Sequence, residues 1–233
     1  MIVGIMQPYL FPYIGYFQLI SVCDKFVIHD DVQYIKGGWI NKNRILSNGE
    51  PKSITLPLRK ASSYLPINQR NFVPDFQKQK LKVIRQIETS YRKAPHFRDV
   101  TEVLDRCFSN EEENISKFIA SSLRLCCDYL DIKTTFIFSS VMEKDDDLKG
   151  QSRVINICKC LGADTYINAI GGQELYEKST FADEGIELLF LRTGDVRYSQ
   201  LASGFVANLS IIDVMMFNDK EKCHELLREY ELI

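Results

Sequence analysis

Short apolar runs alternate with longer helical periods in both the first and the last third of the chain. The short runs predict strands at residues 2–6, 25–29, 134–139, 165–169 and 186–191. Apolar residues at helical spacing predict helices at residues 14–22 and 151–161, and another after Ser210. Because strands alternate with helices, we predict an α/β fold with a mostly parallel, Rossmann-like sheet.

The middle of the chain has a different pattern. Asn48-Gly49 separates two apolar runs and predicts a hairpin, with its return strand at 53–58. From Asp75 the apolar spacing becomes helical and predicts three helices, the third capped by Asn110.

These patterns predict one domain over residues 1–233. Its α/β core is expected at residues 1–65 and 132–215, with an inserted or flanking helical segment at about 75–130. The charged run Glu143–Asp147 is expected to be a solvated loop, and the end of the chain a charged tail after the last helix.

Composition and charge argue against several classes of protein. A net charge of −2 argues against nucleic acid as a partner, because nucleic-acid-binding domains usually carry a strongly basic face. No apolar run is long enough for a membrane span, and no signal peptide is recognised at the start. The seven cysteines lack zinc-site spacing, so we expect reduced thiols in a cytoplasmic protein and no metal.

Polar and aromatic side chains follow the strands at their carboxyl ends, where open α/β sheets bind ligands. We predict catalytic roles for Gln7, His29 and Asp31. We predict that the substrate is bound by Tyr13, Tyr16, Asp24, Gln33, Trp39, Asn41, Arg44, Gly171 and Gly172. One pocket is expected to include Gln7, Tyr16, Asp31, Gln33, Trp39 and Arg44.

Two residues keep a second interpretation. His29 is either a base beside Asp31 or an ordinary histidine at the rim of the core, and Trp39 either stacks on a ligand ring or covers the sheet edge. Asp213 is expected on an amphipathic helix with a partner at the edge of the core.

The first strand, loop and helix contain neither a P-loop nor a Gly-x-Gly-x-x-Gly turn. Their shape is similar to the nucleotidyltransferase signature in which two histidines flank a glycine, but Tyr13 and Tyr16 occupy the histidine places. Tyrosine can hydrogen-bond a phosphate without bringing a positive charge at pH 7. A nucleotidyl- or adenylate-transferring enzyme is therefore one alternative.

Several segments together resemble the WbqC-like family, and the resemblance covers essentially the whole chain. They are Met6–Phe17, Cys23–Val27, Asp30–Tyr34, Trp39–Arg44, Ile54–Leu58, Leu161–Tyr166 and Leu209–Asp213. Lys42 departs from the pattern, which more often has arginine there. The family occurs among bacterial genes for O-antigen and related surface polysaccharides. The resemblance implies a glycine transferase that acylates an amino sugar.

Acyl transfer to a nucleotide-linked amino sugar needs a base and oxyanion donors. Asp31, with or without His29, is the candidate base, and Gln7, Asn41 or a backbone N–H the candidate donor. Trp39 and Arg44 are expected to hold the nucleotide.

The glycyl donor is the gap in this scheme. No coenzyme A signature, hexapeptide repeat or Walker lysine is present, so we expect no cofactor. The chemical form of the glycyl donor is left open, and a carrier-protein thioester is one candidate. Cys23, at the end of an apolar helix, is expected to be a buried and inert thiol. A non-catalytic sugar-nucleotide binding protein is the remaining alternative.

Overall fold

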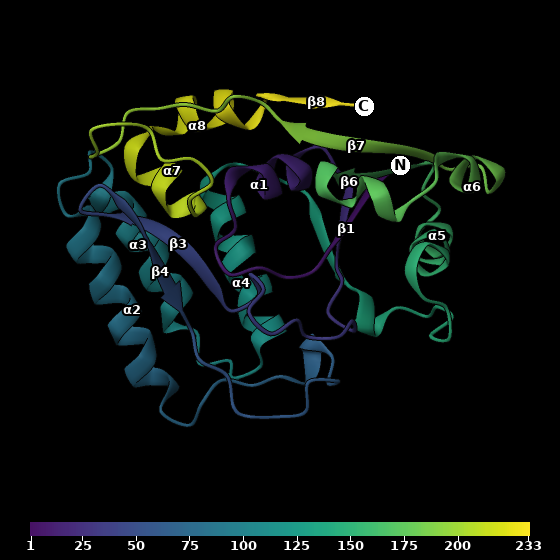
Figure 1. Cartoon of the computed structure of the whole chain (residues 1–233), viewed down its shortest axis with the longest axis horizontal. Coiled ribbons are helices and arrows are strands. Elements are labelled where there is room, and N and C mark those ends of the chain that lie inside the picture. Colours follow the sequence, from purple (N-terminus) through teal and green to yellow (C-terminus); the bar gives the residue numbers. More distant parts are fainter.

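A six-stranded sheet runs through the protein (Figure 1). The computed structural model describes residues 1–233. Neighbouring strands follow the spatial order β5 (Thr135–Phe138), β2 (Lys25–Ile28), β1 (Ile2–Met6), β6 (Thr165–Ala169), β7 (Glu187–Thr193) and β8 (Tyr230–Leu232). The first five are parallel, and β8 is antiparallel to β7.

Numbered along the chain, the sheet strands have the order 3-2-1-4-5-6, which is the Rossmann order. The predicted fold class is confirmed. The order reverses between β1 and β6, so the crevice at their carboxyl ends is where such sheets bind ligands.

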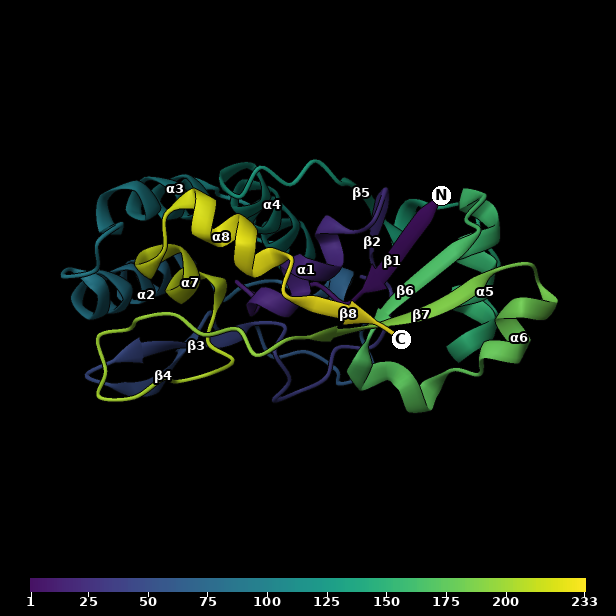
Figure 2. The ribbon, with the colours of Figure 1, turned by 90° about the horizontal axis from the view of Figure 1, so that it is seen from above.

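Helices cover both faces of the sheet (Figure 2). One face packs on α1 (Ile14–Ser21), α4 (Ile115–Tyr129) and α8 (Lys220–Leu227), and the other on α5 (Gly150–Leu161) and α6 (Lys178–Asp183). Successive strand residues point to opposite faces, so Phe26 joins the larger core and Val27 the smaller one.

The segment between β2 and β5 forms a large insertion beside the sheet (Figure 1). It contains the hairpin of β3 (Lys42–Ser47) and β4 (Glu50–Thr55), the helices α2 (Phe76–Tyr91) and α3 (Phe97–Ser109), and α4. Asn48 (φ 53°) and Gly49 (φ 82°) form the turn, which confirms the predicted hairpin. After β7 the chain returns to the insertion as α7 (Ile211–Phe217).

Three predicted elements are corrected. The return strand begins at Glu50 rather than residue 53, because a two-residue turn allows Ser47 and Glu50 to pair at once. Asn114 rather than Asn110 caps α4, since its Oδ1 accepts from the backbone N–H of the second and third residues of the helix. The charged tail is instead α8 followed by β8.

Short 3₁₀ turns complete the fold at Ile67–Gln69, Ser139–Val141 and Ile170–Leu175. The last two directly follow β5 and β6 at the carboxyl edge of the sheet. Gly162 has a φ of 69° just after α5, the left-handed conformation that favours glycine at the end of a helix.

The loop from β1 to α1 contains a strained turn at Phe11, which is buried with a φ of 41°. This φ is a genuine outlier for a bulky residue and costs on the order of 1–3 kcal/mol. Asn43 Nδ2 donates to the carbonyls of Leu10 (3.0 Å) and Phe11 (2.8 Å), and Ser210 Oγ donates to Phe11 (2.7 Å). These hydrogen bonds hold the turn in place.

We expect Asn43→Ala to lower the free energy of unfolding by about 2–4 kcal/mol, because the Leu10 carbonyl and the Arg44 N–H lose their side-chain partner and the Phe11 carbonyl keeps only Ser210 Oγ as a donor. Chemical denaturation measures the change. Ser47→Ala, on the same strand, is the control and should change stability by less than about 0.5 kcal/mol. Equal stabilities for the two variants would show that Asn43 does not hold the turn.

Candidate functional site

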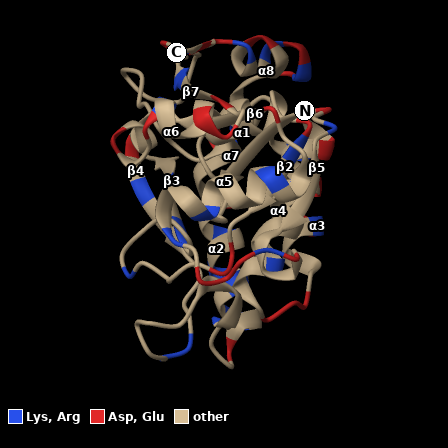
Figure 3. Cartoon of the chain, turned by 90° about the vertical axis from the view of Figure 1, so that its right-hand side faces the viewer, with Lys and Arg blue, Asp and Glu red and all other residues tan.

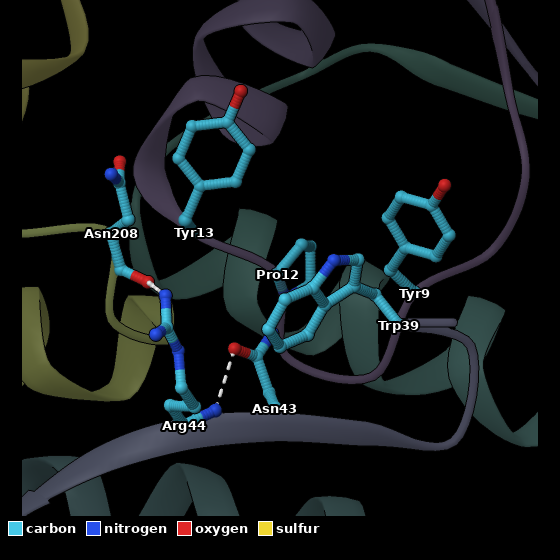
Figure 4. A pocket seen from close by; sticks show the side chains of 7 residues that line it. All are labelled: Tyr9, Pro12, Tyr13, Trp39, Asn43, Arg44 and Asn208. Atoms are coloured by element: carbon cyan, nitrogen blue, oxygen red, sulfur yellow. Dashed lines mark hydrogen bonds between the residues drawn. The ribbon is translucent and has the colours of Figure 1, made fainter. Parts of the chain in front are cut away.

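A cavity of about 250 Å³ lies among segments that follow the carboxyl ends of β1, β2 and β7 (Figure 4). The β1–α1 loop, the segment entering β3 and the segment before α7 supply its lining: Tyr9, Pro12, Tyr13, Trp39, Asn43, Arg44 and Asn208. The rings of Tyr9, Tyr13 and Trp39 surround the opening, and Arg44 reaches toward Asn208 (Figure 4). The lining contains one guanidinium and no carboxylate.

Arg44 is held through both its backbone and its side chain. Its N–H donates to Asn43 Oδ1 (2.8 Å), and its carbonyl accepts from the Ser210 N–H (2.8 Å). One guanidinium nitrogen lies 3.5 Å from the Asn208 carbonyl, while Nε is buried without a partner. The side chain is therefore held in position where it lines the cavity.

Trp39 offers a partly open aromatic face. Its side chain is 42% exposed, and the Arg44 guanidinium carbon lies 5.3 Å from the ring centre. Lys42 Nζ lies 5.5 Å from the same ring. An indole beside two cations suits a ligand that combines a planar ring with a negative group.

Asp31 lies in a separate polar cluster at the ends of β2 and β5. Its carboxylate accepts from Lys144 Nζ (2.7 Å), an Arg153 guanidinium nitrogen (2.5 Å) and Ser139 Oγ (2.5 Å). The Lys144 side chain is 2% exposed, although it belongs to the charged run predicted to be solvated. That expectation is corrected for Lys144, because pairing with Asp31 lets its ammonium be buried.

The cluster sets the charge states of its members. Burial acts to raise the pKa of Asp31, but hydrogen bonds from Lys144 and Ser139 and the charge of Arg153 hold that pKa below its usual value. Burial lowers the pKa of His29 to about 4, with the Asp31 charge opposing the shift and the two cations adding to it. At neutral pH, Asp31 is an ion-paired carboxylate and His29 a neutral imidazole.

One ring nitrogen of His29 has no hydrogen-bond partner. Its Nε2 is buried without a hydrogen bond and lies 3.8 Å from Asp31 Oδ1, while the side chain is 16% exposed. The backbone N–H of His29 donates to the Met6 carbonyl at 2.8 Å, which places the imidazole next to the end of β1.

Acidic and basic positions are interspersed on the side of the molecule drawn in Figure 3.

Two of the predicted binding residues have structural partners. The Tyr16 hydroxyl is buried and donates to the Gln7 carbonyl at 2.8 Å. Asn41 accepts from the Tyr34 hydroxyl (2.8 Å) and donates to the Leu56 carbonyl (2.9 Å). Both polar groups of the Asn41 side chain are therefore used within the protein.

Two others lie away from the cavity. Asp24 precedes β2 and accepts from the Ile2 N–H at 2.7 Å, so it lies at the amino edge of the sheet, opposite the carboxyl ends. Gln33 is exposed and donates to the Ser63 carbonyl at 3.0 Å. Of the residues expected in one pocket, only Trp39 and Arg44 line this cavity, so that expectation is corrected.

Gly171 and Gly172 form the 3₁₀ turn after β6. A Cβ at Gly172 would lie 2.3 Å from Asn168 Nδ2, so packing on this side chain already requires a glycine. Cys23 is buried, and burial raises the pKa of its thiol, in line with an inert cysteine.

Residues that were not predicted from the sequence complete both the cavity and the cluster around Asp31. Tyr9, Pro12, Asn43 and Asn208 line the cavity, and Lys144, Arg153 and Ser139 surround Asp31. Tyr9, Pro12 and Asn43 lie inside the segments that carry the family resemblance, so that signal was available. Lys144 and Arg153 have no local signal.

The strand order and the cavity beside the carboxyl ends define a Rossmann-like α/β protein with a ligand pocket built partly from an insertion. The chain belongs to the WbqC-like protein family, whose sequence model matches residues 7–225. The uncharacterized protein Rv1507c of Mycobacterium tuberculosis is 28% identical over 228 residues, which cover 97% of each chain. No solved structure matches. None of the helices is both long and apolar enough to cross a membrane.

We expect the imidazole of His29 to titrate near pH 4 when followed by NMR. Because the unfolded chain binds this proton near pH 6.5, the stability contributed by neutral His29 falls as the pH drops from 6.5 toward 4. The loss reaches up to about 3 kcal/mol. Denaturation of His29→Gln should show a shallower fall over that range. Titration near pH 6.5 would contradict the buried neutral state.

Proposed function

We propose that this protein is an acyl transferase that attaches a glycyl group to the amine of a nucleotide-linked sugar in bacterial O-antigen or related surface-polysaccharide synthesis. The observation that carries the binding half is the cavity with Trp39 and Arg44 beside the carboxyl edge of a Rossmann-ordered sheet. The glycyl group and the pathway rest on the family resemblance.

The cavity suits the nucleotide portion of such a ligand. The base would stack on the rings of Trp39 or Tyr13, and its phosphates would accept from the Arg44 guanidinium in the cavity lining. Lys42 Nζ adds a second cation 5.5 Å from the centre of the Trp39 ring. The mixture of aromatic rings with few polar groups is typical of small-molecule sites.

His29 is the better base of the two candidates. Asp31 is held by two cations, so it accepts a proton poorly, whereas neutral His29 has a free ring nitrogen. Its pKa of about 4 makes it a weak base, but the imidazole is unprotonated at neutral pH and can therefore accept a proton. Gln7 follows β1 and lies next to His29. Tyr9, which lines the cavity, is two residues after Gln7, so the Cα atoms of Gln7 and Tyr9 are at most about 7 Å apart.

In this scheme the sugar amine attacks the carbonyl carbon of the glycyl donor. A nitrogen–carbon bond forms, the bond from that carbon to the donor's leaving group breaks, and the imidazole of His29 takes the amine proton. The Gln7 amide would donate to the developing oxyanion. Asp31 then faces the imidazolium and stabilises it.

The nucleotidyl-transfer alternative gains no support from a specific contact. Of the tyrosines at the histidine places of that signature, Tyr16 is buried and bonded to Gln7, and only Tyr13 reaches the cavity. Release of pyrophosphate from ATP would distinguish that reaction from acyl transfer.

We expect Arg44→Ala to weaken binding of UDP- or dTDP-linked amino sugars about ten- to a hundredfold, because a charge-assisted hydrogen bond to phosphate is lost. Isothermal titration calorimetry measures the dissociation constants. Arg85→Ala, at an exposed position of α2 with the same charge change, is the control and should bind normally. Equal affinities for both variants would place the nucleotide elsewhere.

We expect His29→Gln to lower turnover about 10²–10⁴-fold, the usual contribution of a general base, while nucleotide-sugar affinity is kept. Mass spectrometry of the acylated sugar nucleotide measures turnover with a panel of glycyl donors. Full activity of the variant would remove His29 from the mechanism. Failure of the unaltered protein with every donor, despite tight binding, would favour a non-catalytic binding protein.

A further inference from the structure

Two neighbouring loops of the insertion expose three large apolar side chains. Ile35 and Trp39 belong to the loop between β2 and β3, and Tyr64 belongs to the loop between β4 and the 3₁₀ turn at Ile67–Gln69. Their exposed fractions are 56%, 42% and 83%, and Tyr64 is the most exposed large apolar residue of the chain. Single exposed apolar residues are common on protein surfaces, whereas a group of them marks a contact site.

Hydrogen bonds hold the two loops side by side. The Tyr34 N–H donates to the Leu65 carbonyl at 3.2 Å. The buried Arg70 donates to the Ser62 carbonyl at 2.9 Å, and its guanidinium carbon lies 4.6 Å from the centre of the Tyr34 ring. The surface formed by the two loops is therefore preformed, which limits the entropy lost when a partner binds.

The same part of the chain is basic. Residues 32–74 contain seven lysines and arginines and one carboxylate, although the whole chain has a net charge of −2. Arg59 is paired with Glu113 (2.6 Å), while Lys36 and Lys60 are exposed within the two loops, which contain no carboxylate of their own. Apolar side chains among lysines fit a partner surface that is acidic around an apolar centre.

We propose that the loop surface, formed by Ile35, Lys36, Trp39, Lys60 and Tyr64, docks an acidic carrier protein that delivers the glycyl group as a thioester on a flexible arm. The inference rests on the proposed function, because it names the partner that supplies the donor of that reaction. The donor is the one component that the scheme above leaves open.

The loop surface lies next to the groups that the reaction uses. Trp39 belongs both to the loop surface and to the cavity lining, so a partner seated on the surface lies at the cavity opening (Figure 4). Ile35 is six residues after His29, so the Cα atoms of these two residues are at most about 22 Å apart. A flexible arm has to span about this distance at most to bring its thioester to the imidazole.

The thioester supplies the carbonyl that the sugar amine attacks. A nitrogen–carbon bond forms at the glycyl carbonyl, the carbon–sulfur bond breaks, and the imidazole of His29 takes the amine proton. The sulfur leaves with the bonding electrons and receives that proton from the imidazolium. The products are the glycyl amide of the sugar and the free thiol of the carrier, so the step needs no further reactant.

An anionic membrane would also attract lysines that lie beside aromatic residues. It fits this surface less well than a protein does, because Trp39 also lines the cavity that the water-soluble sugar nucleotide must enter. Burial in lipid would withdraw the indole from that ligand. A carrier protein covers the opening only while it delivers the glycyl group.

The test compares a donor on a protein with the same donor free. The first is a panel of acyl carrier proteins from the host bacterium, each loaded with glycine on its phosphopantetheine thiol. The second is the thioester of glycine with N-acetylcysteamine, which has the reactive end of the arm and no protein. Lys36→Glu/Lys60→Glu reverses the charge of the loop surface. Lys133→Glu/Lys178→Glu, at exposed positions before β5 and on α6, is the control with the same change of charge.

We expect Lys36→Glu/Lys60→Glu to raise the KM for the carrier-bound donor at least about tenfold, because like charges then face each other. Its turnover with the free thioester and its affinity for sugar nucleotides should stay within about twofold of the unaltered protein, as for other exposed substitutions. The control should leave the KM values for both donors unchanged. Ile35→Ser/Tyr64→Ser, which removes exposed apolar contacts, should act as the charge reversal does.

Equal KM values for the carrier-bound donor in the loop-surface variants and the control, or equal losses with both donors, would overturn the docking site while acyl transfer stands. Turnover with the free thioester but with no carrier of the panel would overturn it as well. Sedimentation with vesicles of neutral and anionic phospholipids completes the test. Vesicle binding that the loop-surface variants lose, without turnover from any carrier, would assign the surface to a membrane instead. If the unaltered protein turns over neither donor, the proposed function and this inference fail together.

Discussion

The carboxamide of Asn43 connects the parts of the protein that form the pocket. Its nitrogen donates to Leu10 and Phe11 in the β1–α1 loop, and its oxygen accepts from the Arg44 N–H. Other Rossmann folds make the first strand-to-helix turn with glycines. Here Phe11 takes the left-handed conformation, and hydrogen bonds from the insertion and from α7 offset its strain. The pocket is therefore shaped by contacts between segments that are far apart in sequence.

Electrostatics divide the carboxyl edge of the sheet into two regions. Around Asp31, two cations and a hydroxyl satisfy one half-buried carboxylate, while burial keeps the neighbouring imidazole neutral. Around Arg44, a cation lies next to aromatic rings with no carboxylate in the lining. Pairing makes the Asp31 cluster part of the stable fold, because removing one partner would leave a buried charge. The Arg44 guanidinium lines the cavity and forms no salt bridge with a carboxylate.

Local sequence patterns predicted most helices and strands, but they could not predict which residues pair across long distances in the chain. The strand at residues 165–169 and the Asn48-Gly49 turn were found from neighbouring residues alone. The pairing of Asp31 with Lys144 was not, since its partners are 113 positions apart and Lys144 lies in a run of charges typical of a solvated loop. Asp24 shows a further limit: its acidic side chain was noted, but its position before rather than after β2 places it at the opposite edge.

The insertion supplies part of the cavity lining. The strands supply only the edge, whereas Trp39, Asn43 and Arg44 come from the segment between β2 and β5. The same segment carries Asn41, whose carboxamide is used to fix Tyr34 and Leu56 behind the pocket. A change in the insertion would therefore alter the cavity while the Rossmann order of the sheet stayed the same. Because the fold hosts many functions, substrate choice in this chain must be sought in the residues of the insertion and the segment after β7.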